Sequence, residues 1–305
     1  EQTARFAELE LPVLINGETG TGKELVARAL HNASYRQQAP FLAINCAALP
    51  EHLLESELFG YANGAFTGAQ KGGKPGLLEL AEGGTLFLDE IAEMSPYLQA
   101  KLLRFLQDFK FRRLGGTKEL HANVRVVSAT HQDLLIMISK QKFREDLFYR
   151  LNVLNLHAPP LRKRIEDIAL IAQHFVVLAA AQMNLQQPKV DESAMKLLSS
   201  YHWPGNIREL QNVLFRAVAL NESGDITSQD ISIALAQFKQ PEVTNKVEFK
   251  VENAVEDWAS AQAKFEQQLI NALYPFYPTT RKLAERLKVS HNKIAMKLRQ
   301  FGIKS

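Results

Sequence analysis

The stretch Gly17-Glu18-Thr19-Gly20-Thr21-Gly22-Lys23-Glu24 decides how the first half of this chain folds. The apolar run Val13-Leu14-Ile15 before it predicts a short buried strand, and the run from residue 25 to 30 predicts a helix. Glycines in such a loop let backbone N–H groups turn inward at the helix N-terminus, and Lys23 adds a charge for the outer phosphates of a nucleotide. The stretch therefore predicts a phosphate-binding loop, with a plain glycine turn as the alternative.

The last position of this loop departs from the usual pattern. The spacing GxxxxGK is met, but Glu24 stands where a Ser or Thr hydroxyl normally reaches Mg²⁺. A magnesium ion beside this loop would therefore depend more on carboxylates elsewhere in the chain.

Length and composition bound the class of protein. The 305 residues are enough for two or three domains, and 46% hydrophobic with 23% charged residues can build a core. The net charge of +3 is small, so a basic surface for nucleic acid must be sought locally. The single cysteine, Cys46, excludes an intramolecular disulfide and fits a reducing cytoplasm. We expect no membrane span, because the most apolar run, 168–183, predicts a buried helix.

Strand-like and helical runs alternate from residue 1 to 157. Further strands are predicted at 41–44, 85–88, 124–127 and 153–156, and this alternation predicts an α/β fold with a parallel sheet sandwiched by helices. Residues 158–238 predict an all-α lid subdomain. Residues 239–254 lose apolar periodicity and predict a linker, and 255–305 predict a small helical domain. The chain begins without Met, almost on its first predicted strand, so we expect residues upstream.

A second motif, Gly83-Gly84-Thr85-Leu86-Phe87-Leu88-Asp89-Glu90, is an apolar strand that ends in two acids. Asp89 would lie beside the phosphates and hold Mg²⁺, and Glu90 would polarise an attacking water. Alone, such a pair more often marks a strand that enters a solvated turn. After a phosphate loop in an α/β pattern, the catalytic interpretation is favoured. We predict no structural metal.

The order of these motifs resembles that of the bacterial enhancer-binding transcription regulators, whose central domain is a sigma-54 activator type AAA+ ATPase. The matching motifs are the phosphate loop, Asn45-Cys46-Ala47, Glu57-Leu58-Phe59-Gly60, Gly64-Ala65-Phe66-Thr67-Gly68-Ala69, the strand ending in Asp89-Glu90, the run 143–153 and the run 203–210. The resemblance covers about residues 9–235. It implies a P-loop core with a lid, ATP and Mg²⁺ as ligands, and a hexamer that forms with nucleotide.

The resemblance implies roles for residues around the nucleotide. Asn45 would be the switch residue that holds Glu90 until the nucleotide state releases it. Thr130 would be the first sensor. The family commonly places Asn after this sensor, where this chain has His131, and we expect His131 to be a polar neighbour of the nucleotide rather than a metal ligand.

Three arginines take further roles by the same resemblance. Arg144 and Arg150 would reach a neighbouring subunit's nucleotide as arginine fingers, where an added charge stabilises the phosphoryl transition state. Surface ion pairs with adjacent acids are the alternative for both. Arg208 would be the second sensor, through which the lid touches the phosphates, and packing against a nearby tryptophan is its alternative.

The run Gly64-Ala65-Phe66-Thr67-Gly68-Ala69 predicts a loop with an exposed Phe-Thr tip between glycines, which suits contact with a partner. The resemblance implies that it engages the alternative sigma factor of RNA polymerase. A surface loop without a partner is the other interpretation.

The C-terminal residues predict a helix-turn-helix domain. A first helix, a second helix over 280–287, a turn with Ser290 as N-cap, and a third helix over 291–300 follow one another. The expected core residues are Phe265, Leu269 and Leu273 on the first helix, with Leu283, Leu287, Val289, Ile294, Leu298 and Phe301. A helical hairpin for packing or dimerisation is the alternative.

The last of these helices is the candidate for the major groove of an operator in double-stranded DNA. Its N-terminal residues His291, Asn292 and Lys293 are candidates for base contacts, because recognition helices enter the groove with that end first. Phosphate contacts are expected from basic residues in the markedly basic stretch 279–305. The expected DNA-binding residues outside the base-contact group are Thr280, Arg281, Lys282, Arg286, Ser290, Lys297 and Arg299.

The run 277–299 and the segments 94–96, 99–106 and 111–113 are also similar to tyrosine-responsive members of this family, which control aromatic amino acid synthesis and transport. These regulators usually repress with the housekeeping polymerase and often carry an altered sigma-contact loop. Tyrosine or a related aromatic amino acid is then the implied co-effector, and a dimer on DNA the implied assembly. Because the loop is intact here, an activator of the sigma-54 polymerase is the alternative.

Two other hypotheses remain from the sequence. Glu24 and His131 favour a protein that binds ATP as an assembly switch without useful turnover. A third class is an ATPase that remodels partners unrelated to transcription.

Overall fold

The computed structural model describes residues 2–65, 72–221, 224–236, 257–274, 277 and 279–302. The chain divides into two compact units, Glu1–Ala236 and Gln237–Ser305, and each is described by itself. The predicted linker 239–254 and residues Phe66, Thr67, Gly68 and Ala69 of the predicted partner loop lie outside the described residues.

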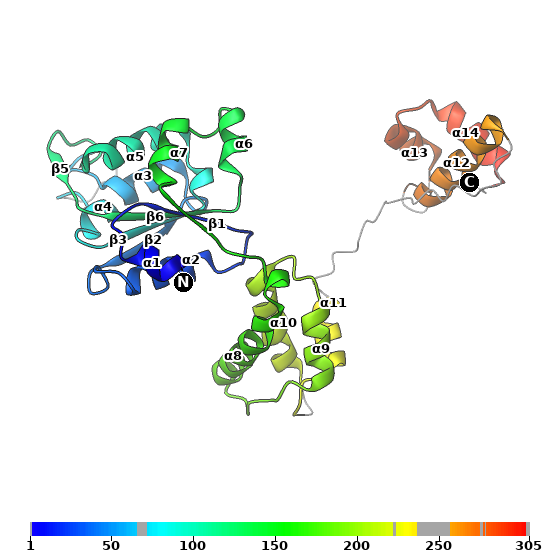
Figure 1. The fold of residues 1–305 in the computed structure, drawn as a ribbon. Helices are drawn as coiled ribbons and strands as arrows, with labels where there is room; N and C mark the ends of the chain where they lie inside the picture. The colour runs from blue at the N-terminus through cyan, green and yellow to red at the C-terminus, as the bar shows by residue number, and fades with distance from the viewer. Residues whose placement is uncertain are drawn as a thin grey trace. The chain divides into compact units, whose positions relative to one another are not determined.

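A five-stranded parallel sheet forms the centre of the first unit (Figure 1). Its strands are β1 (Val13–Asn16), β2 (Phe41–Asn45), β3 (Thr85–Asp89), β6 (Arg125–Thr130) and β7 (Leu154–His157), in the spatial order β2-β3-β6-β1-β7. The α/β fold class and all five predicted strands are confirmed. In register, Asn45 lies opposite Asp89 and Asn16 opposite Thr130, so the polar ends of the strands share one edge of the sheet.

Helices cover both faces of this sheet, which explains why its strands are apolar on both sides. Leu14, Leu86 and Leu88 pack into a core with α3 (Glu51–Phe59), α5 (Pro96–Asp108) and α7 (Glu145–Leu151). Val13, Ile15 and Phe87 pack on the other face with α1 (Gln2–Ala7) and α2 (Lys23–Asn32). Figure 1 shows these two helix layers above and below the strands.

Smaller elements join this framework. They are α4 (Leu77–Leu80), the 3-10 helix η1 (Ile91–Glu93), α6 (Leu134–Ser139) and an antiparallel pair of strands, β4 (Lys110–Arg112) and β5 (Glu119–His121). This strand pair was not expected from the sequence. Each strand has three residues with a charged residue at one end or both, which leaves no apolar run to recognise.

The lid is helical, as predicted, and packs around Trp203, whose side chain is fully buried. It consists of the 3-10 helix η2 (Leu161–Lys163), α8 (Ile165–Met183), α9 (Glu192–Ser200), α10 (Asn206–Leu220) and α11 (Ser228–Ala236). By length and composition alone, α8 could cross a membrane. Ile168, Ala172 and Val176 are nevertheless buried within the lid, where α8 packs beside α10, so one face of α8 belongs to the core of the lid.

In the second unit, the described residues form the helices α12 (Trp258–Leu273), α13 (Thr280–Leu287) and α14 (His291–Gln300). Thr279 and Ser290 cap α13 and α14, because each hydroxyl accepts from the backbone N–H three residues later. The predicted core is confirmed around Leu283, Ile294 and Leu298. The prediction for Phe265 is wrong: its side chain is 45% exposed, and Ile270 fills the core instead. The apolar face of α12 includes both Phe265 and Ile270, and the packing of α13 and α14 determines which of the two is buried.

Candidate nucleotide-binding site and DNA-binding helix

The predicted phosphate loop connects β1 to α2 at the carboxyl edge of the sheet. Gly20 and Gly22 have φ of 80° and 87°, in the left-handed region that favours glycine. Within the described part of the chain, the N–H groups of Thr19, Gly20 and Gly22 donate to no acceptor. Unpaired N–H groups at the start of a ten-residue helix form an anion-binding site, so the loop fits a nucleotide phosphate.

Lys23 lies at the first position of α2 and is 6% exposed. Its Nζ donates to the carbonyl oxygens of Gly17 at 3.1 Å and Glu18 at 3.4 Å, and to Oε1 of Glu90 at 3.4 Å. The phosphate loop and the acidic end of β3 are therefore joined by one ammonium group.

Glu24 points away from this centre. Its Oε1 accepts from Arg28 Nη2 at 2.8 Å one helical turn later, and both side chains are half exposed. With Glu24 paired to Arg28 and no hydroxyl at this position, Asp89 at the end of β3 is the candidate ligand for Mg²⁺.

Asp89 at the end of β3 fits that role. Its Oδ2 accepts from Asn45 Nδ2 at 3.3 Å, and its Oδ1 accepts from the N–H of Glu90 at 3.1 Å. Burial raises the pKa of Asp89, and the adjacent charge of Glu90 raises it further. A divalent cation would relieve both effects, since it supplies positive charge to two crowded carboxylates. The described residues contain no cluster of three or more His, Cys, Asp and Glu that could hold a metal.

The partner of Asn45 differs from the expectation. Asn45 donates to Asp89 and not to Glu90, because the two strands pair Asn45 with Asp89 in register. Its Oδ1 accepts from the N–H of Ala47 at 2.9 Å, so both ends of the amide are occupied.

Glu90 is held by His131 instead. Oε2 of Glu90 lies 2.7 Å from Nδ1 of His131 and 3.3 Å from its backbone nitrogen. Burial raises the pKa of Glu90, while the hydrogen bond from His131 and the charge of Lys23 lower it, and the net pKa lies below the ordinary value. The lowered pKa favours the ionised form, which a group that polarises water needs.

Thr130, the expected first sensor, is fully buried at the end of β6. Its hydroxyl accepts from the N–H of Gln132 at 3.0 Å, and its carbonyl accepts from the N–H of Gly17 at 3.2 Å. The hydroxyl therefore shapes the turn that carries His131, and the side chain that faces Glu90 belongs to His131.

The lid contacts the phosphate loop directly. Arg162 donates to both carboxylate oxygens of Glu18, at 2.5 Å and 2.8 Å. Asn206, which is fully buried, donates to Glu18 Oε2 at 3.2 Å and to the carbonyl of Thr19 at 3.0 Å. Neither residue was given a role from the sequence, although Asn206 lies in the run 203–210 and Arg162 lies two residues after Pro160.

Arg208, the expected second sensor, lies beside the same loop. A Cβ built on Gly20 would lie 3.2 Å from the Cβ of Arg208, so α10 begins against the phosphate loop. The Arg208 side chain is exposed and has no hydrogen-bond or ion-pair partner in the part of the chain that the structure describes. Its position is compatible with a contact to bound phosphate.

The two expected arginine fingers differ in their surroundings. Arg144, the N-cap of α7, donates to both oxygens of Asp146, at 3.0 Å and 2.7 Å, as the ion-pair alternative predicted. Arg150 lies on the exposed surface of α7 without a side-chain partner among residues 2–65, 72–221 and 224–236. Arg150 is therefore the better placed of the two to reach another molecule.

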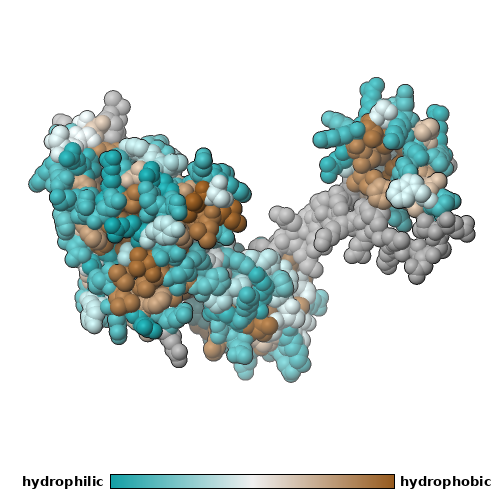
Figure 2. Space-filling view, turned by 45° about the horizontal axis from the view of Figure 1, so that its top comes forward, coloured by the Kyte–Doolittle hydropathy of each residue, from teal (hydrophilic) through white to brown (hydrophobic). Residues whose placement is uncertain are grey.

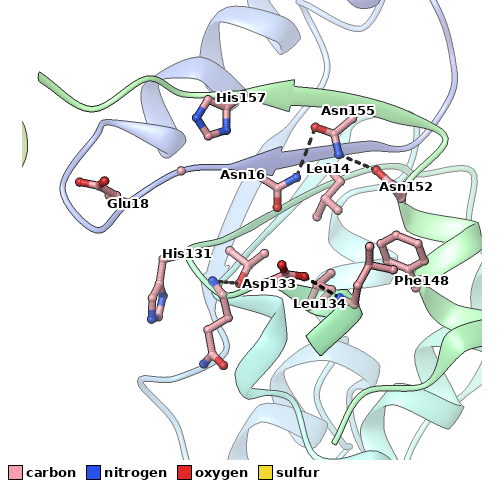
Figure 3. A pocket seen from close by; sticks show the side chains of 14 residues that line it. Leu14, Asn16, Glu18, His131, Asp133, Leu134, Phe148, Asn152, Asn155 and His157 are labelled. Carbon is pink, nitrogen blue, oxygen red and sulfur yellow. Dashed lines mark hydrogen bonds between the residues drawn. The ribbon is translucent and has the colours of Figure 1, made fainter. Parts of the chain in front are cut away.

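A cavity of about 410 Å³ adjoins the site (Figure 3). Glu18 and His131 lie at one end and Phe148 at the other, and a chain of amides runs between Asn16, Asn155 and Asn152. The cavity extends from the loop after β6, which carries His131, to Phe148 of α7. Apolar side chains also reach the surface of this unit in patches (Figure 2), and Leu135 and Ile136 of α6 are both more than half exposed.

The predicted DNA-binding residues lie on α13 and α14 or at their N-caps. His291, Asn292 and Lys293 are exposed in the first turn of α14, and His291 Nε2 lies 2.6 Å from Thr280 Oγ1. Lys297 differs from the expectation, because its Nζ pairs with Glu266 Oε2 of α12 at 2.6 Å. Arg281, Lys282, Arg286 and Arg299 are exposed and can contact phosphates, whereas Lys297 ties α14 to α12.

Comparisons with known proteins agree with this arrangement. Family models match the Sigma-54 interaction domain over residues 1–157, the AAA+ ATPase lid domain over 162–248 and a helix-turn-helix domain over 260–304. The chain is 46% identical over 303 residues to the HTH-type transcriptional regulatory protein TyrR of Enterobacter agglomerans, which covers 99% of this chain and 57% of that one. The chain belongs to the family that carries the Sigma-54 interaction domain.

Two other proteins are also similar to this chain in sequence or structure. The Regulatory protein AtoC of Escherichia coli is 46% identical over 305 residues, 99% of this chain and 65% of that one. The crystal structure of NtrX from Brucella abortus in complex with ADP is 33% identical, with a TM-score of 0.70 over 99% of this chain and 67% of that one. The chain spans little more than half the length of the TyrR relative. The AAA+ fold, the lid and the helix-turn-helix domain of the sequence analysis are thereby confirmed.

Proposed function

We propose that this chain is an ATP-binding regulator of transcription that acts in the cytoplasm on genes of aromatic amino acid synthesis and transport, mainly by repression. The observation that carries the proposal is the set of unpaired phosphate-loop amides that lies on the same sheet edge as Asp89 and Glu90. The same chain carries α14, whose first turn exposes His291, Asn292 and Lys293. Its TyrR-like relatives are named as transcriptional regulators.

ATP would bind with Mg²⁺ in this proposal. Lys23 and the loop amides would hold the phosphates, and Asp89 would hold the metal. Glu90 would polarise the attacking water. Tyrosine or a related aromatic amino acid would be the co-effector, which the similarity to tyrosine-responsive regulators supports.

Assembly would couple the nucleotide to the operator. We infer a dimer on DNA and a hexamer with nucleotide, in which Arg150 of one subunit reaches the nucleotide of the next. Its side chain is exposed and has no partner among the described residues of the first unit, which supports that role. RNA polymerase would be the further partner, through its sigma subunit.

Phosphate release by the wild type and by Glu90→Gln tests the enzymatic part. We expect Glu90→Gln to bind ATP normally and to lose turnover by about a hundredfold or more, because the group that polarises water becomes neutral. Equal rates would remove hydrolysis from the proposal. The chain would then be an ATP-dependent assembly switch.

A second candidate function is activation of the sigma-54 polymerase. The intact sequence of residues 64–69 and the match to the Sigma-54 interaction domain favour it. Selection of bound genomic DNA with and without ATP plus tyrosine separates the two candidates. Sites beside aromatic amino acid genes support the first, and sites far upstream of sigma-54 promoters support the second. Binding no tighter than to random duplex at the same salt would favour a remodelling ATPase unrelated to transcription.

A further inference from the structure

We propose that His131 positions Glu90 for catalysis by holding one oxygen of its carboxylate, while the entry of phosphate frees the other. This inference rests on the proposed hydrolysis of ATP and names the residue that makes Glu90 competent. The family resemblance implied instead that Asn45 holds Glu90 and that His131 is only a polar neighbour of the nucleotide.

The two oxygens of Glu90 have different partners. Oε2 lies 2.7 Å from His131 Nδ1 and 3.3 Å from the His131 backbone nitrogen, so a single residue holds this oxygen at two points. Oε1 accepts only from Lys23, at 3.4 Å, among the residues that the structure describes. The hydrogen bond from His131 to Oε2 is therefore shorter than the contact from Lys23 to Oε1. The longer contact at Oε1 is the one that a bound phosphate can replace.

Lys23 is the residue that would change partners, from Glu90 to the phosphate. An ammonium has three donors, and those of Lys23 are occupied by two loop carbonyls and Glu90. Lys23 can donate to a bound phosphate only by giving up one of these contacts. The Glu90 contact is among the two longer ones, and a phosphate offers Lys23 more negative charge than one carboxylate oxygen. Its release leaves Oε1 free to accept a hydrogen bond from the attacking water.

The backbone at Glu90 is fixed by its own hydrogen bonds, because its N–H donates to Asp89 Oδ1 at 3.1 Å and its carbonyl accepts from the N–H of Glu93 at 3.0 Å. Glu90 adopts φ 51° and ψ 51°, a left-handed conformation that is unfavourable for a residue with a Cβ. A residue in this region keeps one orientation only when its surroundings fix it. The carboxylate at the end of the side chain needs a separate restraint. Asn45 makes no hydrogen bond to it, since the Asn45 amide donates to Asp89 and accepts from Ala47. The restraint on the carboxylate comes from His131 in the loop after β6, whose turn is shaped by the buried hydroxyl of Thr130.

The position of the donor atom explains which residues could replace His131. Nδ1 of His and Nδ2 of Asn are both separated from Cβ by one atom, so Asn can present an N–H group at nearly the same place. Gln presents its N–H groups one bond further out, and Ala presents none. His131→Asn should therefore preserve the contact with Glu90 Oε2, and the Gln and Ala variants should lose it.

Steady-state ATP hydrolysis by the full chain, with kcat and KM measured separately, tests this inference. We expect His131→Ala and His131→Gln to lower kcat by about tenfold or more with KM changed by less than about threefold, since a misplaced catalytic group affects the transition state most. His131→Asn should restore kcat to within about threefold of the wild type. His174→Ala, on the exposed side of α8, is the matched control and should leave both constants unchanged.

A double variant shows whether His131 acts through Glu90. In the Glu90→Gln background, His131→Ala should have no further effect on kcat, because the group that it positions is already lost. A normal kcat in His131→Ala, failure of Asn to restore it, or full additivity in the double variant would each overturn the inference while leaving the proposed function intact. A wild type that binds ATP without releasing phosphate would overturn the proposed hydrolysis, and the inference with it.

Discussion

Glu18 in the phosphate loop and Arg162 at the start of the lid form a bidentate ion pair, with N–O distances of 2.5 Å and 2.8 Å. The buried amide of Asn206 donates to the same carboxylate. The loop that would wrap the phosphates is thus fastened to the lid by its own second residue. A movement of the loop on nucleotide binding should therefore also move the lid, because the ion pair connects the two.

The stability of this connection should depend on pH in a defined window. Hydrogen bonds from Arg162 and Asn206 lower the pKa of Glu18 from 4.5 to about 2. A carboxylate whose pKa is lowered by folding stabilises the folded state above its unfolded pKa, and this contribution is lost as pH falls toward the folded pKa. The wild type should therefore be more stable to urea than Glu18→Gln at neutral pH, with a difference that shrinks between pH 4.5 and about 2.

The control for that measurement is Glu192→Gln, which removes an exposed pair with Lys196 on α9. Exposed pairs within one helix contribute little, so this variant should follow the wild type closely across the same window. A gap between wild type and Glu18→Gln that stays constant down to the lowest pH would contradict the assignment.

A side chain at Gly20 should separate the loop from the lid. A Cβ there would lie 2.3 Å from the carbonyl oxygen of Gly205, and the backbone of both residues is fixed by surrounding contacts. We expect Gly20→Ala to weaken the binding of a fluorescent ATP analogue by about tenfold or more, because the lid cannot close on the loop. Gly224→Ala carries a similar positive φ with open space around it, and its ATP affinity should match that of the wild type.

Arg150 should act on a neighbouring subunit, whereas Arg144 is partly satisfied within its own chain. Arg150→Ala should lower phosphate release by about a hundredfold or more, as loss of an arginine finger does, without lowering ATP affinity. Mixing Arg150→Ala with Glu90→Gln should restore part of the turnover, since some sites then combine an intact Glu90 with an intact Arg150. Turnover that does not recover on mixing would place Arg150 outside the neighbour's site.

Two lysines on α14 should respond differently to removal. Lys293 is exposed and makes no side-chain hydrogen bond or ion pair within the described terminal domain, whereas Lys297 pairs with Glu266. Lys293→Ala should weaken operator binding by about tenfold and change its dependence on salt, because a contact to DNA is lost. Lys297→Ala should mainly lower the melting temperature of the domain. The reverse pattern in DNA titrations and thermal unfolding would contradict these assignments.

Much of this site was predictable because its parts are local in sequence. The glycine spacing from Gly17 to Gly22 requires a tight turn between a strand and a helix, whatever surrounds it. The apolar run before Asp89 places that residue at a strand end, and parallel strands bring their ends to one edge. The capping hydroxyl of Ser290 likewise defines the start of α14 from neighbouring residues alone.

The partners of these residues were not predictable, because they depend on how distant segments meet. Asn45 contacts Asp89 rather than Glu90 since strand register decides which residues face each other. His131 contacts Glu90 from the loop after β6, and no sequence pattern near either residue predicts this contact. Lys297 was expected at a DNA phosphate and is instead paired with an acid on α12.

By itself, the sequence determined the α/β core, the phosphate loop, the helical lid and the terminal helix-turn-helix, since each follows from periodicity and turn chemistry over short stretches. Only the tertiary structure decided which side chain holds Glu90, and that Glu18 fastens the loop to the lid. Hydrogen bonds and ion pairs are short and directional, so a difference of one residue in register, or a small change in how a loop packs, selects a different partner.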